Sequence, residues 1–176
     1  TNRTTSCKKC PKGRFRSAHD PADDCKYCPE GYINHLEARS SCFICDATQG
    51  DYMDEKGSSK TGCKSCPKGY KFQNFNARCS PCNQGFRQTL SNSNIKIQIC
   101  EKCEAGRYQN ENGNTRCAEC QVGKYTDGDG KAACSYCEPE DVSLQDKTGC
   151  RHCPTGWTHG GTQEECKTCA RGKAAR

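Results

Sequence analysis

Apolar positions along this chain are few, and they do not follow a helical period. Twenty of them are cysteines, and the other recurring apolar position is one aromatic residue placed shortly after a glycine. Examples are "CKKCPKGRF" at 7–15, "CKYCPEGY" at 25–32 and "CKSCPKGY" at 63–70. Glycine adopts positive φ at low cost and so predicts a turn, after which a short extended segment carries the ring. The pattern predicts short irregular β-hairpins and leaves little room for helix.

All 20 cysteines fall in Cys-x-x-Cys motifs spaced 16 to 21 residues apart. Repetition at such a short period predicts a tandem array in which each unit contacts mainly its neighbours. The ten motifs are Cys7/Cys10, Cys25/Cys28, Cys42/Cys45, Cys63/Cys66, Cys79/Cys82, Cys100/Cys103, Cys117/Cys120, Cys134/Cys137, Cys150/Cys153 and Cys166/Cys169.

Eight motifs carry a glycine three residues after their second cysteine, and the motifs that begin at Cys42 and Cys134 do not. In seven of the eight an aromatic residue follows, and we expect its ring to lie over the nearby disulfide as a miniature core. These rings are Phe15, Tyr32, Tyr70, Phe86, Tyr108, Tyr125 and Trp157.

The array carries a second level of repetition. "CKKCPKGRF" at 7–15 matches "CEKCEAGRY" at 100–108, and "KTGCKSCPKGY" at 60–70 matches "KTGCRHCPTGW" at 147–157. This predicts an ancestral duplication of five motifs. The expected organisation is an N-terminal segment at 1–6, five repeats at 7–99, five more at 100–169 and a C-terminal segment at 170–176.

The composition indicates that cysteines, and not an aliphatic core, stabilise the fold. Ile, Leu, Val and Phe together make up about 9% of the chain, below the ~20% under which a chain tends to remain disordered. Cysteine makes up about 11%, and such a density is typical of secreted disulfide scaffolds. The sequence therefore predicts a small disulfide-rich fold with a minimal hydrophobic core, in which all 20 cysteines form disulfides.

Cysteine pairs of this spacing also occur in zinc sites and redox enzymes. Disulfides are favoured over zinc because the linkers are short and supply almost no aliphatic core for a zinc ribbon. A redox motif begins a helix, whereas Pro and Gly follow the cysteines here. No motif is followed by the histidine of a haem attachment site. We expect no metal and no cofactor.

Two disulfide schemes are compatible with the motifs. In the favoured scheme neighbouring motifs pair first-to-first and second-to-second, as in Cys7–Cys25 with Cys10–Cys28, which closes every cysteine within the segment. In the alternative, the second cysteine of each motif pairs with the first of the next, starting at Cys10–Cys25. That scheme leaves Cys7 and Cys169 without partners in the segment, and the five-motif duplication favours it.

Charge and hydropathy give a location but no nucleic-acid partner. The net charge of +6 arises from 27 basic and 21 acidic residues interspersed along the chain, without the single stripe that nucleic acid requires. No apolar run reaches transmembrane length and no signal-peptide pattern opens the chain. We expect an extracellular or cell-surface piece of a longer secreted or membrane-anchored protein, without membrane insertion of this segment. The sequon Asn2-Arg3-Thr4 makes Asn2 a candidate glycosylation site.

The motif Cys-x-x-Cys-Pro-x-Gly-[Tyr/Phe], followed by a short loop and another Cys-x-x-Cys, resembles the ephrin-receptor-like cysteine-rich repeats. It is also similar to tumour-necrosis-factor-receptor, furin-like and EGF-like modules. The resemblance extends from Cys7 to Cys169 and implies an elongated, secreted or membrane-anchored spacer.

Residues outside the Cys-x-x-Cys motifs were considered as indicators of function. The four histidines are scattered in polar context, so an enzyme is not expected, and Asp127 and Asp129 are interpreted as a hairpin tip rather than a calcium site. A structural spacer in a filamentous assembly is favoured, with a receptor or adhesion ectodomain as the alternative. The partners in both cases are other protein chains. Ile95, Ile97 and Ile99 alternate with polar residues, predicting a strand whose apolar face covers a neighbouring module or a partner chain.

Overall fold

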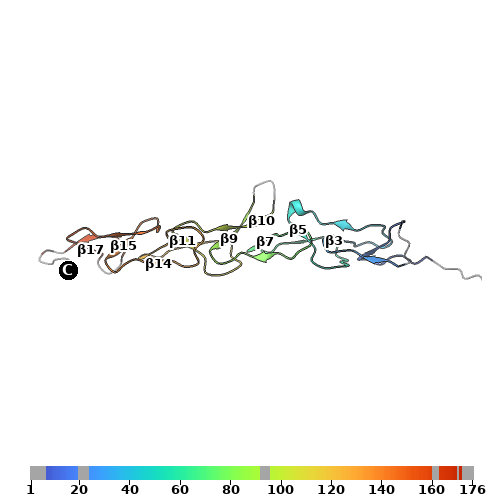
Figure 1. Ribbon diagram of the computed structural model, residues 1–176, viewed down its shortest axis with the longest axis horizontal. Coiled ribbons are helices and arrows are strands. Elements are labelled where there is room, and N and C mark those ends of the chain that lie inside the picture. Colours follow the sequence, from blue (N-terminus) through green and yellow to red (C-terminus); the bar gives the residue numbers. More distant parts are fainter. Residues whose placement is uncertain (1–6, 20–23, 92–95, 160–162, 170, 172–176) are drawn as a thin grey trace, which may run out of the picture. The chain divides into compact units, whose positions relative to one another are not determined.

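The fold is described from a computed structural model that places residues 7–19, 24–91, 96–159, 163–169 and 171. Within these ranges the chain forms short strands in nine two-stranded sheets and one 3-10 helix, η1 (Ala47–Gln49) (Figure 1). The sheets pair β1 (Arg14–Phe15) with β2 (Lys26–Tyr27), β3 (Tyr32–Ile33) with β4 (Phe43–Ile44), β5 (Asp51–Tyr52) with β6 (Lys64–Ser65), β7 (Tyr70–Lys71) with β8 (Ser80–Pro81), β9 (Phe86–Leu90) with β10 (Gln98–Lys102), β11 (Arg107–Tyr108) with β12 (Ala118–Glu119), β13 (Lys124–Tyr125) with β14 (Ser135–Tyr136), β15 (Asp141–Ser143) with β16 (Cys150–His152), and β17 (Trp157–Thr158) with β18 (Lys167–Thr168). The predicted hairpin array is confirmed.

Seven of the nine described hairpins begin at a predicted glycine turn. In the first motif the amide of Arg14 donates to the carbonyl of Pro11 at 3.1 Å, and Gly13 between them has φ +77°. Glycine at the third position of a four-residue turn is the expected residue where φ must be positive. The strand after the turn then pairs with the two residues that lie between the cysteines of the next motif, as in Arg14 opposite Tyr27.

The favoured disulfide scheme is wrong, and the alternative describes the molecule. The second cysteine of each motif is bonded to the first cysteine of the next, so that one disulfide closes each hairpin. The nine bonds are Cys10–Cys25, Cys28–Cys42, Cys45–Cys63, Cys66–Cys79, Cys82–Cys100, Cys103–Cys117, Cys120–Cys134, Cys137–Cys150 and Cys153–Cys166.

The period of the strand explains this pairing. The two cysteines of a motif flank a two-residue strand and are three positions apart, so their side chains project from opposite faces. Cys25 therefore turns back to its own hairpin, whereas Cys28 turns forward into the next. A pairing that joined both cysteines of one motif to the same neighbour would need them on one face.

Cys7 and Cys169 have no disulfide partner in the structure, so the prediction that every cysteine closes within the segment is also wrong. They are the first cysteine of the first motif and the second of the last, the two positions that this scheme leaves over. The amide of Cys169 still donates to the carbonyl of Gly156 at 3.2 Å, as the amide of Cys120 does to Gly106 at 3.0 Å.

The buried interior consists mostly of sulfur. In each of the nine motifs with a bonded second cysteine, that cysteine is at most 7% exposed, whereas the buried apolar residues of other types number four in the described chain: Ile33, Tyr52, Met53 and Val142. One hydrophobic cluster joins Ile33, Met53 and the Cys45–Cys63 disulfide, and Phe75 packs against it. The predicted minimal core is confirmed.

The chain divides into two compact units. Unit 1 comprises Thr1–Pro67, Lys71–Ser80 and Leu90–Gln98, and unit 2 comprises Lys68–Tyr70, Pro81–Thr89 and Ile99–Arg176. These units are defined by contacts, so the five-motif duplication inferred from sequence matches stays a prediction.

The motif that begins at Cys42 lacks the normally spaced glycine but recovers the same geometry. Asp46 caps η1 by accepting from the amide of Thr48 at 2.9 Å, and Gly50 ends the helix with φ +75°. The helical turn inserts two residues, and strand β5 then starts directly after Gly50, as β1 starts after Gly13.

Candidate functional site

Consecutive modules are joined by a hydrogen bond at a fixed position. The donor is the backbone amide of the turn glycine in one module. The acceptor is the residue three positions after the turn glycine of the next module, or its equivalent where that glycine is missing, and we call this acceptor position the latch position. Gly31 donates to the carbonyl of Met53 at 2.7 Å, and Gly106 to the hydroxyl of Thr126 at 2.7 Å. The residues that accept such a bond are Asn34, Met53, Gln88, Gln109, Thr126 and Ser143.

Sequence reasoning missed the latch position, although a signal was present. Most of its residues are polar and yet buried, Asn34 being 0% and Thr126 3% exposed. A polar side chain at this depth needs a hydrogen-bond partner. The Thr126 hydroxyl accepts from the Gly106 amide, whereas the Asn34 side chain donates to the carbonyl of Arg14 at 2.7 Å and its backbone carbonyl accepts from the Gly13 amide. In the sequence, the signal is the recurrence of Asn, Gln or Thr three residues after a turn glycine.

The same glycines are also contacted by the module after next. A Cβ added to Gly69 would lie 1.7 Å from the carbonyl oxygen of Gly113, and one added to Gly85 would lie 2.1 Å from that of Gly130. The tip of one hairpin therefore seats directly on a glycine about 44 residues earlier. The predicted nearest-neighbour contacts are real, but this second layer was not expected.

The aromatic rings are only partly sheltered. Six of the seven are half-buried, and Trp157 is 42% exposed. Tyr32 meets Phe75 edge to face at 6.2 Å between ring centroids. A role for the rings as covers of the disulfides stays a prediction.

Unit 1 exposes an apolar surface at the β3–β4 hairpin. Ile44 is 59%, Leu36 43% and Phe43 38% exposed. The Phe43 ring stacks on His35 at 5.6 Å, and the guanidinium of Arg39 lies 4.9 Å from its centroid. Exposed apolar groups framed by cationic and imidazole side chains suit a protein contact.

The β9–β10 hairpin contains the predicted isoleucine interface in part. Ile95 lies outside the described residues, Ile97 is half-buried, and Ile99 is 38% exposed on β10. Of the residues predicted to form this strand, Gln98 and Ile99 lie in β10, and Lys96 and Ile97 precede it. In the same hairpin the guanidinium of Arg87 pairs with the carboxylate of Glu101 at 2.9 Å.

The best-connected ion-pair network in unit 1 centres on Asp54, whose side chain is 11% exposed. Lys64 Nζ contacts its Oδ1 at 2.6 Å and Arg78 Nε its Oδ2 at 2.9 Å, and Lys64 also contacts Glu55 at 2.5 Å. Hydrogen bonds from Lys64 first, and then from Arg78, lower the pKa of Asp54 from 3.8 to about 2.

Asp54→Asn is expected to destabilise unit 1 by roughly 1–2 kcal/mol at neutral pH, since much of the network is open to solvent. The folded-state pKa lies below the unfolded value, so the stabilisation is fully present above about pH 4. It disappears as the pH falls toward 2. Urea unfolding at several pH values measures this, with Glu30→Gln as the control. A pH-independent gap between wild type and Asp54→Asn would contradict it.

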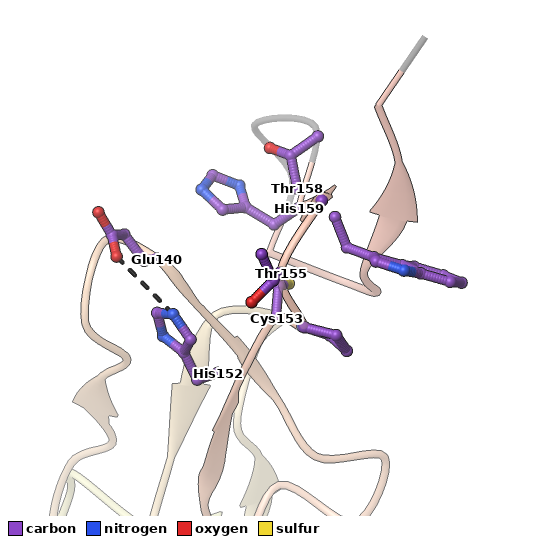
Figure 2. Close-up of a pocket in the computed structure, with 9 residues that line it drawn as sticks. Glu140, His152, Cys153, Thr155, Thr158 and His159 are labelled. Carbon is purple, nitrogen blue, oxygen red and sulfur yellow. Dashed lines mark ion pairs between the residues drawn. The ribbon is translucent and has the colours of Figure 1, made fainter. Parts of the chain in front are cut away.

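Unit 2 contains an open hollow of about 270 Å³ beside the Cys153–Cys166 disulfide. Figure 2 shows Glu140, His152 and His159 around the same opening, with Thr155 between them. His152 Nδ1 lies 2.9 Å from Asp141 Oδ1, and its Nε2 lies 3.9 Å from Glu140 Oε2. The structure thus brings together two histidines that the sequence interpretation treated as scattered.

This arrangement lacks the order of a catalytic site. The Nε2 atom of His152, which would accept a proton from a nucleophile, faces a carboxylate instead, and the sulfur of Cys153 is in a disulfide. His152 is 67% exposed, so water reaches the imidazole freely. The hollow suits weak polar contacts better than chemistry.

Among the described residues, no group of three or more His, Cys, Asp or Glu side chains is placed to hold a metal ion. None of the helical structure in those same ranges has the length and apolar character needed to cross a membrane.

Comparisons with known proteins give a partial match. The chain is 35% identical over 98 residues to the mouse (Mus musculus) protein named "Sushi, von Willebrand factor type A, EGF and pentraxin domain-containing protein 1", and 34% identical over 98 residues to the rat (Rattus norvegicus) protein of the same name. Each match covers 53% of this chain and 2% of the relative. The chain therefore spans a small fraction of either protein. No family profile matches it.

Fold, disulfides and similarity agree on the class of molecule. Nine disulfides in tandem hairpins require an oxidising compartment to form and persist. The chain is a cysteine-rich repeat module located outside the cell or at its surface.

Proposed function

We propose that the chain is a disulfide-stapled spacer that mediates protein–protein contacts in a cell-surface or secreted filamentous assembly. The observation that carries the proposal is the repetition of one set of restraints. Within each unit the hairpins share a closing disulfide, a latch to the next module and a glycine seat for the module after next. Such restraints resist bending between modules, which is what a spacer needs.

The relatives support the modular part of this proposal. Their name describes a protein assembled from several domain types, and a repeat segment between such domains would set their spacing. We further propose that the modules are of the ephrin-receptor-like kind, that five of them were duplicated, and that Asn2 carries an N-linked glycan.

The experiment that tests the contact function replaces Ile97 and Ile99 with asparagine. We expect the double variant to be secreted normally and to lose assembly, because the substitution places amides on the strand that would bury apolar area against a partner. Negative-stain electron microscopy and light scattering measure assembly. Tyr136→Asn is the matched control, since Tyr136 is 74% exposed on another hairpin. Assembly that survives in the isoleucine variant would contradict the proposal.

A receptor or adhesion ectodomain is the second candidate, and the β3–β4 surface favours it. Leu36, Phe43 and Ile44 are exposed apolar side chains of the kind that anchor a protein ligand. In that case Ile44→Asn, and not the change at Ile97 and Ile99, would abolish the protein contact.

We also propose that Cys7 and Cys169 form disulfides with cysteines outside the nine observed bonds. They stand at the two positions that continue the ladder in either direction. Alkylation of the natural, full-length protein under non-reducing conditions, followed by peptide mass mapping, is expected to find both residues unmodified by the reagent. Quantitative alkylation of either one would contradict this.

A further inference from the structure

The first motif concentrates positive charge that its sequence counterpart lacks. Residues 7–19 contain five basic residues and no acidic one. In the matching stretch 100–108, Glu101 stands where Lys8 stands in the first motif, and Ala105 where Lys12 stands. The two stretches share backbone geometry, with a glycine turn and a following two-residue strand. The difference between them is therefore one of charge.

The strand partners repeat this difference. Arg107 lies opposite Glu119 in the hairpin register, and their charged groups are 2.6 Å apart. The equivalent Arg14 lies opposite Tyr27 instead. Its guanidinium carbon is 3.9 Å from the Tyr27 ring centroid, and it donates to the Tyr27 hydroxyl. A ring orients the guanidinium without neutralising it, whereas the carboxylate of Glu119 compensates Arg107.

The lysines of the first motif are equally uncompensated. Lys8, Lys9 and Lys12 are exposed, and no ion pair or hydrogen bond joins their side chains to another described residue. Lys64, in an equivalent position of the fourth motif, instead contacts both Asp54 and Glu55.

The first two hairpins contain further basic residues. Lys26 lies opposite Phe15 in the β1–β2 register, and the amide of Arg16 donates to the carbonyl of Arg39 at 3.1 Å. Residues 1–45 contain eight basic residues against five acidic ones, Asp20, Asp23, Asp24, Glu30 and Glu37. The charge that is spread along the whole chain is thus uneven on unit 1.

We propose that this surface, defined by Lys8, Lys9, Lys12 and Arg14, binds a sulfated polysaccharide of the glycosaminoglycan class. The protein is extracellular, and sulfated polysaccharides are the chain-like polyanions of that space. Lysine supplies compact point charges and arginine a planar fork, and both suit sulfate oxygens spaced along a flexible polymer. The proposal is independent of the spacer function, because it concerns charge on one hairpin and not assembly.

The test measures binding of the 176-residue disulfide-bonded chain to a heparin oligosaccharide over a range of salt concentrations. Lys8→Glu with Lys12→Ala gives the first motif the residues of its counterpart at two positions. We expect roughly tenfold or greater loss of affinity and a salt slope smaller by about two, since each lost charge contact removes about one. The control is Lys56→Glu with Lys60→Ala, which changes the net charge equally on exposed lysines of the same unit. It is expected to bind as wild type does.

Several results would overturn the proposal. These are no binding of wild type to heparin, equal binding of desulfated heparin, and equal weakening in the control variant, which would mean a response to net charge alone. Tighter binding to phosphatidylserine vesicles than to heparin at equal charge concentration would assign the surface to a membrane instead. Secretion and thiol titration of each variant establish that the disulfides have formed.

Discussion

Gly69→Ala is expected to cost about 3 kcal/mol or more of the free energy of unfolding of unit 2, an unusually large effect for one methyl group. Gly69 has φ +85°, and its new Cβ would lie 1.7 Å from the carbonyl oxygen of Gly113. Backbone cannot move aside as a flexible side chain can. The amide of Gly113 donates to the carbonyl of Cys82 at 2.7 Å, and the amide of Cys82 to the carbonyl of Gly69 at 2.9 Å. Displacing the tip strains both bonds.

Gly156→Ala separates the cost of the positive φ angle from the cost of the steric clash with a neighbouring backbone. Gly156 has φ +83°, nearly the same as Gly69, but no atom of the described residues lies within 4 Å of the position of a Cβ. It should lose only the cost of a left-handed backbone for an L residue, about 1–2 kcal/mol. Urea unfolding followed by near-ultraviolet circular dichroism measures both variants. Equal losses of unfolding free energy in Gly69→Ala and Gly156→Ala would show that the contact between Gly69 and the Gly113 carbonyl contributes nothing to stability.

Removal of one disulfide by Cys28→Ala with Cys42→Ala is the second large effect expected. The bond joins residues 14 apart, and Cys28 is fully buried. Loss of such a loop closure costs about 3 kcal/mol in the chain-entropy account. The damage should concentrate in the β3–β4 hairpin and its neighbours, because each module depends on local restraints. Hydrogen exchange of backbone amides measures this distribution.

The same variant tests the pairing itself. If Cys28 and Cys42 are partners, their joint removal exposes no new thiol. If neighbouring motifs paired first-to-first and second-to-second, two former partners would become free and react with Ellman's reagent. As the control, Cys7→Ser in the 176-residue chain, where Cys7 is exposed and has no disulfide partner, should leave stability unchanged. New thiols in the double variant would contradict the ladder.

Much of the local structure could be predicted because it depends on residues close in sequence. The turn at Gly13 is explained by the tolerance of glycine for positive φ, and the strand at Arg14–Phe15 begins directly after that turn. Even the irregular motif at Cys42 keeps its turn, because Asp46 caps a helical turn and Gly50 ends it. Each of these features depends on residues close to one another along the chain.

The candidate sites were less predictable. His152 and His159 were treated as scattered, because nothing in sequence spacing indicates that two successive hairpins share one hollow. The basic residues of the first motif can be counted in the sequence. Whether an acidic residue neutralises Arg14, however, depends on which residue lies opposite it in the paired strand. Tyr27 opposite Arg14 and Glu119 opposite Arg107 become comparable only once the register is known.

The amino-acid sequence by itself determined the compartment, the disulfide-rich hairpin array and the period at which its units repeat. The reason is that cysteine density, glycine turns and the scarcity of aliphatic residues act locally and additively. Only the tertiary structure decided which cysteines pair, which residue latches each glycine, and which hairpin tip seats two modules away. These depend on the face from which a side chain projects and on how closely two backbones approach, and glycine permits an approach that no other residue would allow.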